Sequence, residues 1–443
     1  MSRPADDPAA VLRREVVLVF AVDIRGTWPP AGFEGGPVLL PWRKGQENEV
    51  TSDAATRDLY SQSGLVPLLW DPAVRLHRAP AEGESPVSSD GLTVDAVELL
   101  RLDRRSRASL AAMAHGTQAN GVAIVHGRLS AQLPPVELPK ALRLAAELNP
   151  QHKGGARRLW MNGVLPAGVR IAEGERKAVH LALVTSAAEL PQLDPGQPAE
   201  ADVHGRWLYH MYLATQSVPD EAAVAALLTR EYHVIGGIRV LFGPRGLVTV
   251  ATRPEVIDPG RQESYYAGSS FRHRTGYADA FALAKLQDIA VSAAEAELLR
   301  LARSEPRRVD VARLERTVLV LQRVYLAAGF GDNRDAHAML RRQYEEAGLA
   351  GRVQTLREDL GELSRQVQTS ESEKTNAILG LIAAVGLPLG TGLAIWSGLP
   401  SAGADSLWRT LLPVGVVILV LVTAFPGLRR LVFDAVKRKG RRS

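Results

Sequence analysis

Two long stretches without a charged residue lie near the carboxyl end of this chain of 443 residues. The first, Ala377 to Leu399, has 23 residues and is mostly Ala, Leu, Ile and Gly. As a helix with a rise of about 1.5 Å per residue it would reach about 34 Å, enough to cross the roughly 30 Å of a bilayer's hydrocarbon core. The second, Thr410 to Leu428, has 19 residues. The pair predicts a hairpin of two transmembrane helices, and the alternative is a hairpin buried in a soluble core.

The residues around the two stretches set the orientation of the hairpin. The linker from Pro400 to Ser406 is so short that the two helices must be antiparallel. The positively charged residues that follow the second stretch are Arg429, Arg430, Lys437, Arg438, Lys439, Arg441 and Arg442. Positive charge in short loops and tails marks the cytoplasmic side of a membrane. We therefore expect a multi-pass protein of the inner (plasma) membrane, with both termini in the cytosol and the basic tail against anionic lipid.

The distribution of charge argues against nucleic-acid binding. The whole chain has a formal net charge of +5, and the tail from Gly427 to Ser443 has +6, which leaves −1 for the rest. A nearly neutral body lacks the basic surface with which proteins bind phosphate backbones. The chain also has no cysteine, which excludes disulfides, thiol nucleophiles and thiolate metal sites.

The chain before the hairpin is polar on average and mixes strand-like and helix-like patterns. We expect an α+β or α/β cytosolic domain, then a long helical stalk, then the two-helix transmembrane hairpin. The predicted segments are a disordered N-terminus (1–14), the cytosolic domain (15–260), the helical stalk or bundle (261–374), the first transmembrane helix (375–400), an external turn (401–409), the second transmembrane helix (410–428) and the basic cytosolic tail (429–443).

Hydrophobic patterns and turn residues place the elements of the cytosolic domain. The predicted strands are Glu15–Val22, Leu65–Trp70, Ala178–Val184, Arg206–Ala214, His233–Phe242 and Leu247–Ala251. The predicted helices are Ser106–Ala119, Pro139–Leu148 and Pro219–Arg230. The order of the strands does not follow from the sequence alone.

We find no constellation of residues that indicates an enzyme. The sequence has no phosphate-binding loop, no GxGxxG that opens a helix, no HExxH and no GxSxG. His115 and His126 fit surface or core positions better than metal ligands. The segment from Phe271 to Arg274, with two arginines and a histidine, would suit an anion, but a solvated helix face is the simpler interpretation.

A helix with one apolar seam precedes the hairpin. The seam residues, spaced alternately by four and three, are Leu349, Val353, Leu356, Leu360, Leu363 and Val367. This a/d spacing is typical of helices that pack along one stripe. No proline lies between Pro306 and Pro388, so we expect the helix to continue unbroken into the first span. Two further helices are predicted at Tyr277–Ser304 and Val309–Ala328, and the seams would pack either within one subunit or between subunits.

The first span has one face of small and weakly polar residues. These pore-lining candidates, at steps of three or four, are Asn376, Gly380, Ala383, Leu387, Thr391, Ala394 and Gly398. In an oligomer this face would form a pore wall, with Leu387 as an apolar constriction and Asn376 at the cytosolic mouth. The alternative is simple helix packing with nothing passing through.

The layout resembles the CorA-like family of divalent metal ion transporters from about Tyr277 to the C-terminus. The local match is Asn376 followed by the Gly-Leu-Pro-Leu sequence from Gly386 to Leu389. The resemblance implies a pentamer with a pore formed by the first span. The family's Gly-Met-Asn signature is replaced here, so its magnesium selectivity does not carry over. The external mouth would instead consist of Gly398, Leu399, Pro400 and Asp405, the last being a carboxylate that would favour cations.

These observations predict a CorA-like oligomeric membrane protein, a cation channel or transporter that its cytosolic domain gates. We expect no bound cofactor, a divalent or monovalent cation as the transported species, and membrane lipid and further copies of the chain as partners. The alternative is a membrane-anchored sensor or defence effector whose hairpin only tethers or permeabilises the membrane. A membrane-bound enzyme comes third, because no catalytic constellation is present.

Overall fold

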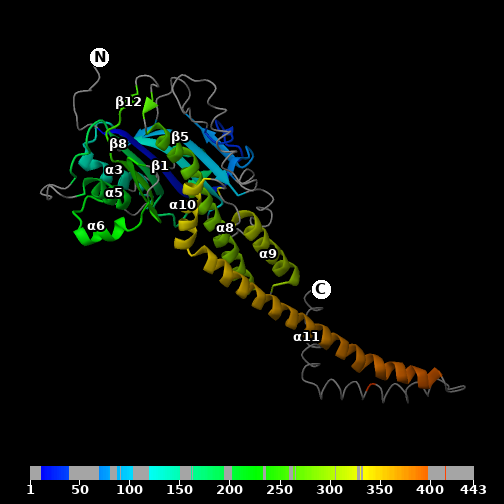
Figure 1. Cartoon of the computed structure of the whole chain (residues 1–443). Coiled ribbons are helices and arrows are strands. Elements are labelled where there is room, and N and C mark those ends of the chain that lie inside the picture. Colours follow the sequence, from blue (N-terminus) through cyan, green and yellow to red (C-terminus); the bar gives the residue numbers. More distant parts are fainter. Residues whose placement is uncertain are drawn as a thin grey trace. The chain divides into compact units, whose positions relative to one another are not determined.

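The computed structural model describes residues 11–38, 69–79, 87–89, 91–102, 119–149, 161, 163–193, 202–232, 236–258, 263–264, 266–304, 306–326, 330, 333–397 and 415. The chain divides into two compact units. The first includes residues 1–304 and 313–358, and the second includes residues 305–312 and 359–443. Figure 1 shows the whole chain.

A mixed β-sheet organises the first unit. In the described residues it has eleven strands, nine of them in the order β2-β3-β5-β6-β1-β8-β11-β10-β9, while β4 pairs with β5 and β7 with β1. The strands are β1 (Val11–Ile24), β2 (Glu34–Gly35), β3 (Arg75–Arg78), β4 (Ser88–Ser89), β5 (Leu92–Arg101), β6 (Gly121–Leu129), β7 (Val169–Ile171), β8 (Val179–Ser186), β9 (Glu231–Tyr232), β10 (Ile238–Gly243) and β11 (Gly246–Ala251). Neighbouring strands are antiparallel except β8 and β11, which are parallel. Strands β12 (Ile257–Asp258) and β13 (Glu263–Ser264) form a separate pair.

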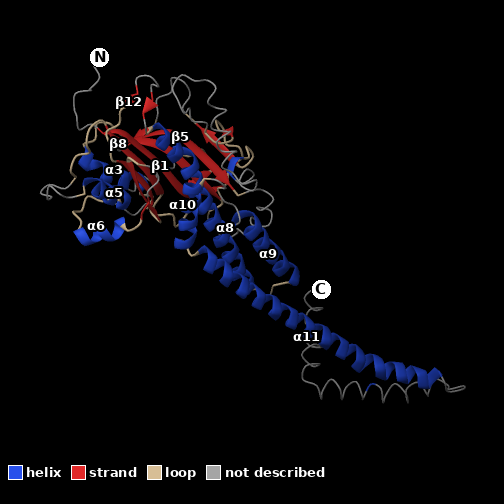
Figure 2. Cartoon of the chain, viewed as in Figure 1, coloured by secondary structure: helices blue, strands red, loops and turns tan. Residues whose placement is uncertain are grey.

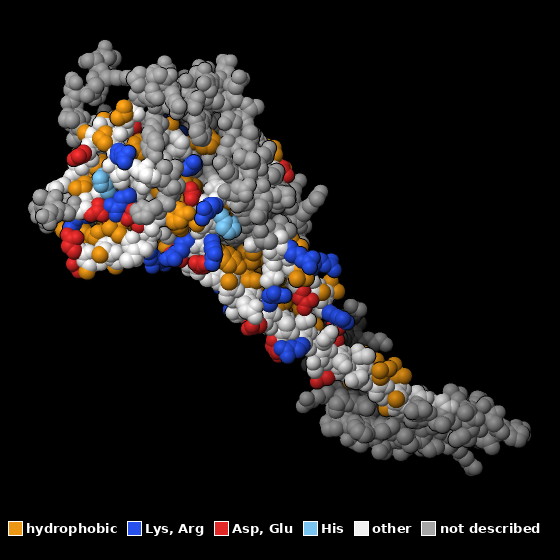
Figure 3. Space-filling view, viewed as in Figure 1, with side chains coloured by type: hydrophobic (Ala, Val, Ile, Leu, Met, Phe, Trp, Pro, Cys, Tyr) orange, Lys and Arg blue, Asp and Glu red, His pale blue; other side chains and the backbone are white. Residues whose placement is uncertain are grey.

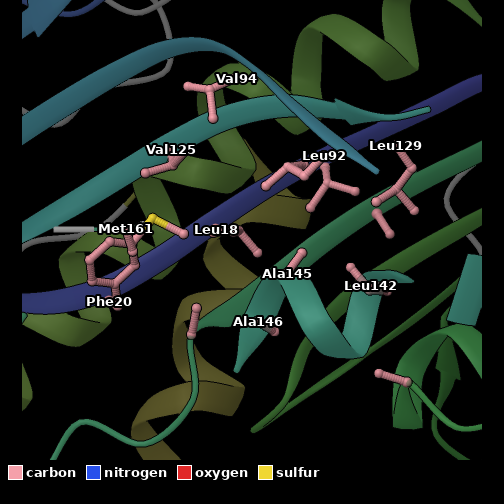
Figure 4. Packing of buried hydrophobic residues seen from close by; sticks show 14 of the residues in the cluster. Leu18, Phe20, Leu92, Val94, Val125, Leu129, Leu142, Ala145, Ala146 and Met161 are labelled. Atoms are coloured by element: carbon pink, nitrogen blue, oxygen red, sulfur yellow. The ribbon is translucent and has the colours of Figure 1, made fainter. Parts of the chain in front are cut away.

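Strand β1 lies at the centre of the sheet, and both of its faces are buried. Leu18 is opposite Val125 of β6 on one side and His180 of β8 on the other. The side chains of β1 alternate between two hydrophobic clusters, one that includes Val17 and one that includes Phe20. Figure 4 shows the second cluster. A strand with two covered faces has a continuous apolar run rather than an alternating one.

Helices cover both faces of this sheet, as Figure 2 shows. The cluster around Phe20 includes residues of α3 (Leu138–Ala146) and α5 (Val203–Leu213), and the cluster around Val17 includes residues of α8 (Ala278–Ala302) and α10 (Arg334–Glu346). The remaining helices are the 3-10 helix η3 (Pro135–Glu137), α6 (Glu221–Leu228), α7 (Ala267–Arg272), the π-helices η4 (His273–Tyr277) and η5 (Leu321–Leu326), α9 (Arg308–Val320) and α11 (Leu349–Ser397). The helices α8 and α10, which lie in the predicted stalk 261–374, thus pack on the sheet.

One predicted strand is wrong. The segment Arg206–Ala214 belongs almost entirely to helix α5, which ends at Leu213. Its aromatic residues favour a strand by propensity, but the Asp202 side chain accepts a hydrogen bond from the Gly205 backbone N–H at 2.9 Å and caps the helix. A second predicted strand, Leu65–Trp70, is described only at Leu69 and Trp70, which lie in a π-helical turn.

Most other predicted elements are confirmed. Strands occur at Glu15–Val22, Ala178–Val184 and Leu247–Ala251, and at the described end of His233–Phe242. Helices occur at Pro139–Leu148, Pro219–Arg230 and Tyr277–Ser304, and over the described part of Val309–Ala328, which ends at Leu326. All of the predicted helix Ser106–Ala119 except Ala119 lies outside the described residues. In the predicted N-terminal segment 1–14, residues 11–14 already belong to β1, and residues 1–10 lie outside the described residues.

Candidate functional site

Helix α11 is the element that contains the predicted pore face. It has 49 residues, Leu349–Ser397, without a break at Thr375, where the first span is predicted to begin. The prediction of one helix that continues from the seam into this segment is confirmed. The physical reason is the absence of proline from this part of the chain before Pro388.

The apolar seam of α11 is buried by the chain itself. Each of its residues is at most 8% exposed: Leu349, Val353, Leu356, Leu360, Leu363 and Val367. Since these values refer to one copy of the chain, the seam packs within one subunit. Every side chain from Gln368 to Gly380 is then exposed. Among these and the next few residues are three large apolar side chains, Ile378, Leu379 and Ile382, with exposed fractions of 51%, 57% and 60%.

The described part of the predicted pore face also lies on the surface. Asn376, Gly380 and Ala383 are exposed. At about 100° per residue they share one face of α11, on the side opposite the seam. Figure 3 shows mixed charged and polar atoms along α11, with hydrophobic side chains at the far end of its coloured part.

The remaining predicted site residues are not all described. Leu387, Thr391 and Ala394 lie in the helical backbone of α11, but their side chains are outside the described residues. The predicted external mouth (Gly398, Leu399, Pro400 and Asp405) and basic tail (Arg429, Arg430, Lys437, Arg438, Lys439, Arg441 and Arg442) are also outside them. Within the described part of the chain, no helix is both long and apolar enough to span a bilayer. The same residues contain no group of three or more His, Asp or Glu side chains that would hold a metal ion.

An arginine near the start of α11 joins this helix to α8. Arg352 donates from Nη1 to Asp288 Oδ1 at 2.6 Å and from Nη2 to Ser292 Oγ at 2.8 Å. It also donates from Nε and Nη2 to the two oxygens of Glu295, at 2.9 and 2.7 Å. The three partners lie on one face of α8, at steps of four and three. The hydrogen bonds with Glu295, followed by the one with Asp288, raise the pKa of Arg352 despite partial burial.

The opposite end of α8 is joined to the sheet by a buried ionic cluster. Arg75 of β3 donates from Nη1 to Asp279 Oδ1 at 2.6 Å and from Nε to Glu98 of β5. Trp70 Nε1 donates to Asp279 Oδ2 at 2.9 Å, and His126 Nε2 is 2.7 Å from Glu98 Oε1. The side chains of Arg75, Glu98, Asp279 and His126 are all 0% exposed.

The groups in this cluster determine one another's protonation states. Burial alone would raise the pKa of Glu98, but the Arg75 guanidinium and the hydrogen bond with His126 lower it well below its usual range. Burial lowers the pKa of His126 in spite of its hydrogen bond with Glu98. His126 is therefore neutral at pH 7 and donates its Nε2 proton to the ionised Glu98. Helix α8 is thus held to the sheet through Asp279 and to α11 through the partners of Arg352.

Sequence reasoning missed both of these attachments. The available signal was a charged residue among apolar neighbours, such as Glu98 within β5 or Asp279 at the start of α8. His126, predicted to be a surface or core residue rather than a metal ligand, is buried in the core. The solvated face predicted for Phe271 to Arg274 is wrong at Phe271 and His273, which are buried.

The fold is a mixed sheet domain, covered by helices, whose chain continues into one long C-terminal helix. No protein-family model matches the sequence, and no curated protein is significantly similar to it.

Proposed function

We propose that the protein is a CorA-like oligomeric membrane protein, a cation channel or transporter that its cytosolic domain gates. The observation that carries the proposal is the unbroken helix α11. It is bonded to α8 by Arg352 at its start and continues into the predicted first span. The transported species is a divalent or monovalent cation.

The membrane hairpin is part of this proposal. Its first helix is residues 375–400 and its second is residues 410–428, in the inner (plasma) membrane with both termini cytosolic. The exposed Ile378, Leu379 and Ile382 support it, because three large apolar side chains within five residues are unfavourable in water and stable in hydrocarbon. The charge-free sequence from Ala377 to Leu399 agrees with this.

The pore requires several copies of the chain, since one helix cannot enclose a pathway. In the proposed oligomer the face with Asn376, Gly380 and Ala383 points to the central axis, and its exposure in a single copy supports this. Leu387 narrows the pathway to an apolar constriction, and a ring of Asp405 carboxylates attracts cations at the outer mouth.

Gating follows from the two attachments of α8. When α8 shifts against the sheet, the buried contact of Arg75 with Asp279 is either intact or broken. The position of α8 therefore has two states rather than a continuous range. The four hydrogen bonds of Arg352 then couple α8 to the first turns of α11. In the proposed mechanism this coupling moves the pore face.

The test is cation flux into liposomes that contain the purified full chain. Leu387→Ser should raise the leak at least several-fold, because it wets the apolar constriction. Leu389→Ala is the matched control, because Leu389 lies on the other side of an ideal helix. Absence of flux from both the wild-type protein and Leu387→Ser would contradict the proposal.

The second candidate is a sensor or defence effector whose hairpin tethers or permeabilises the membrane. The sequence Gly398-Leu399-Pro400, in place of Gly-Met-Asn, favours it. A strict monomer in detergent would support this candidate, because one copy lacks enough helices for a gated pore.

A further inference from the structure

Helix α9 has an outward face that combines arginines with aliphatic side chains. With about 100° per residue, every exposed residue of α9 lies within about 80° of Arg316 around the helix. Together with one exposed residue of η5, this outward face consists of Arg308, Val309, Ala312, Arg313, Arg316, Leu319, Val320 and Arg323. The buried residues Val311, Leu314 and Val318 lie on the opposite side of the helix.

The arginines of the outward face have no partner among the described residues. No hydrogen bond or ion pair joins the side chains of Arg308, Arg313, Arg316 or Arg323 to a residue that the structure describes. By contrast, Arg300 near the end of α8 is paired with Glu297 at 2.6 Å. Arg313 and Arg316 are also one turn apart, and like charges at this spacing destabilise a helix. Carboxylates from another molecule would offset this repulsion.

The acidic residues of α9 do not neutralise the outward face. Asp310 and Glu315 are both half-buried. They lie about 120° and 100° from Arg316 around the helix, on opposite flanks. Four arginines and no acidic residue give the outward face a charge of +4. A partner that covers it must therefore be acidic.

The aliphatic residues of the outward face restrict the partner further. Val309, Leu319 and Val320 are 67%, 47% and 39% exposed. Val309 and Val320 lie between the arginines around the helix rather than apart from them. A phosphate backbone would pair with the arginines but leave these side chains in water. The partner must therefore bring carboxylates and apolar side chains together, as one face of an amphipathic protein helix does.

The position of the outward face favours a protein partner over a lipid surface. The turn η5, which continues α9, contacts α8, beside which α9 lies in Figure 1. Helix α8 is bonded to the first turns of α11 through Arg352. In the proposed topology α11 enters the membrane end-on. A face on the side of this group of helices then meets the cytosol.

We propose that the outward face of α9 is the docking site for an acidic amphipathic helix of a cytosolic protein. From Arg308 to Arg323 the face extends about 22 Å at about 1.5 Å per residue, the length of about four helical turns. Asp or Glu side chains of the partner pair with the arginines, and its apolar side chains cover the aliphatic residues. Since η5 contacts α8, the bound partner reaches the helix that the proposed function uses in gating.

A synthetic peptide tests the docking site on the full chain in detergent. The probe is a helix of about three heptads, with Leu along one stripe and Glu on both flanks of that stripe. Ala312→Cys places a fluorophore on the outward face, and the chain has no other cysteine. The peptide should change the fluorescence saturably. Peptides with Lys in place of Glu, or Ser in place of Leu, should not. No saturable change, or an equal response to the control peptides, would overturn the proposal.

Charge reversal tests whether the arginines bind the peptide. Arg313→Glu with Arg316→Glu, in the labelled chain, should raise the Kd by at least about tenfold. The matched control is Arg143→Glu with Arg170→Glu, which makes the same change in net charge at exposed positions of α3 and β7. The control should bind as the wild-type chain does. An unchanged Kd in the first variant, or equal losses in both, would contradict docking on α9.

Reconstituted vesicles distinguish a protein partner from lipid. The rate at which maleimide labels Ala312→Cys should be the same in vesicles of phosphatidylcholine and in vesicles that also contain phosphatidylglycerol, and the acidic peptide should slow it in both. Slower labelling caused by phosphatidylglycerol alone would show that lipid covers the face, which overturns the proposal.

The docking site and the channel fail separately, because peptide binding requires no ion flux. Binding by a chain that passes no cations supports the docking site and contradicts the channel. Flux from a chain that does not bind the peptide contradicts the docking site alone.

Discussion

The Arg75 guanidinium and the Asp279 carboxylate lie 2.6 Å apart, from Nη1 to Oδ1, and neither side chain is exposed. The two residues are 204 positions apart in the sequence. Their contact joins an edge region of the sheet to the helix that is bonded to α11. The sheet and the long helix are therefore connected through α8, by a buried ion pair at one end of α8 and by the partly exposed ion pairs of Arg352 at the other.

Removal of one charge from this cluster should strongly destabilise the fold. Asp279→Asn leaves Arg75 with Glu98 as its one carboxylate in a fully buried site, and we expect a loss of about 3 kcal/mol or more in the free energy of unfolding. The control is Glu137→Gln, which breaks an ion pair between two exposed side chains, Glu137 and Lys140, and should cost less than about 1 kcal/mol. Chemical denaturation measures the free energy of unfolding of both variants. Equal losses would show that the buried contact contributes no more to stability than the exposed ion pair.

Loss of the Arg352 hydrogen bonds should loosen the start of α11 without unfolding the sheet. Arg352→Gln should raise amide hydrogen exchange in residues 349–358 by about fivefold, since partly exposed ion pairs contribute about 1 kcal/mol. Arg341→Gln breaks a pair with Glu345 within α10 and should leave α11 unchanged. If exchange in α11 is the same in both variants, Arg352 does not hold this helix.

The buried His273 should make the protein less stable in acid. Burial lowers the pKa of His273 to about 3, whereas a histidine in an unfolded chain has a pKa of about 6.5. The unfolded state takes up a proton between these values and the folded state does not, so stability falls as the pH falls below about 6.5. At pH 5 the loss from this residue is about 2 kcal/mol.

His273→Gln should therefore flatten the fall in melting temperature between pH 7 and pH 5. It should not abolish the fall, because burial also lowers the pKa of His180, to about 4. His337→Gln changes an exposed histidine and is the control. An unchanged slope in His273→Gln would contradict this account of His273.

The proposed topology predicts which positions a membrane-impermeant maleimide reaches in intact cells. Ala402→Cys, in the external turn, should be labelled, and Ser443→Cys, at the cytosolic terminus, should be labelled only after the cells are opened. No other cysteine gives a background. Labelling of Ser443→Cys in intact cells would reverse the orientation.

Elements with a local pattern could be predicted from the sequence, and long-range polar contacts could not. The seam from Leu349 to Val367 repeats every three or four residues, so its helix was evident. Strands β5 and β6 were missed because Glu98 and His126 interrupt their apolar runs. The partners that make these residues stable in the core, Arg75 and Asp279, are distant in sequence.

The same distinction applies to the candidate site. The face of Asn376, Gly380 and Ala383 follows from spacing alone, and the structure places the three on one exposed face of α11. The bonds of Arg352 to α8 depend on how two helices cross, which spacing does not give.

The most direct test of the central claim is where the full chain partitions in cells. Membranes are collected from cells that express it, washed with alkaline carbonate, and floated on a density gradient. A chain anchored by residues 375–400 and 410–428 stays with the floating bilayers and enters solution only with detergent. Recovery of folded protein in the aqueous fraction after the wash would contradict the account.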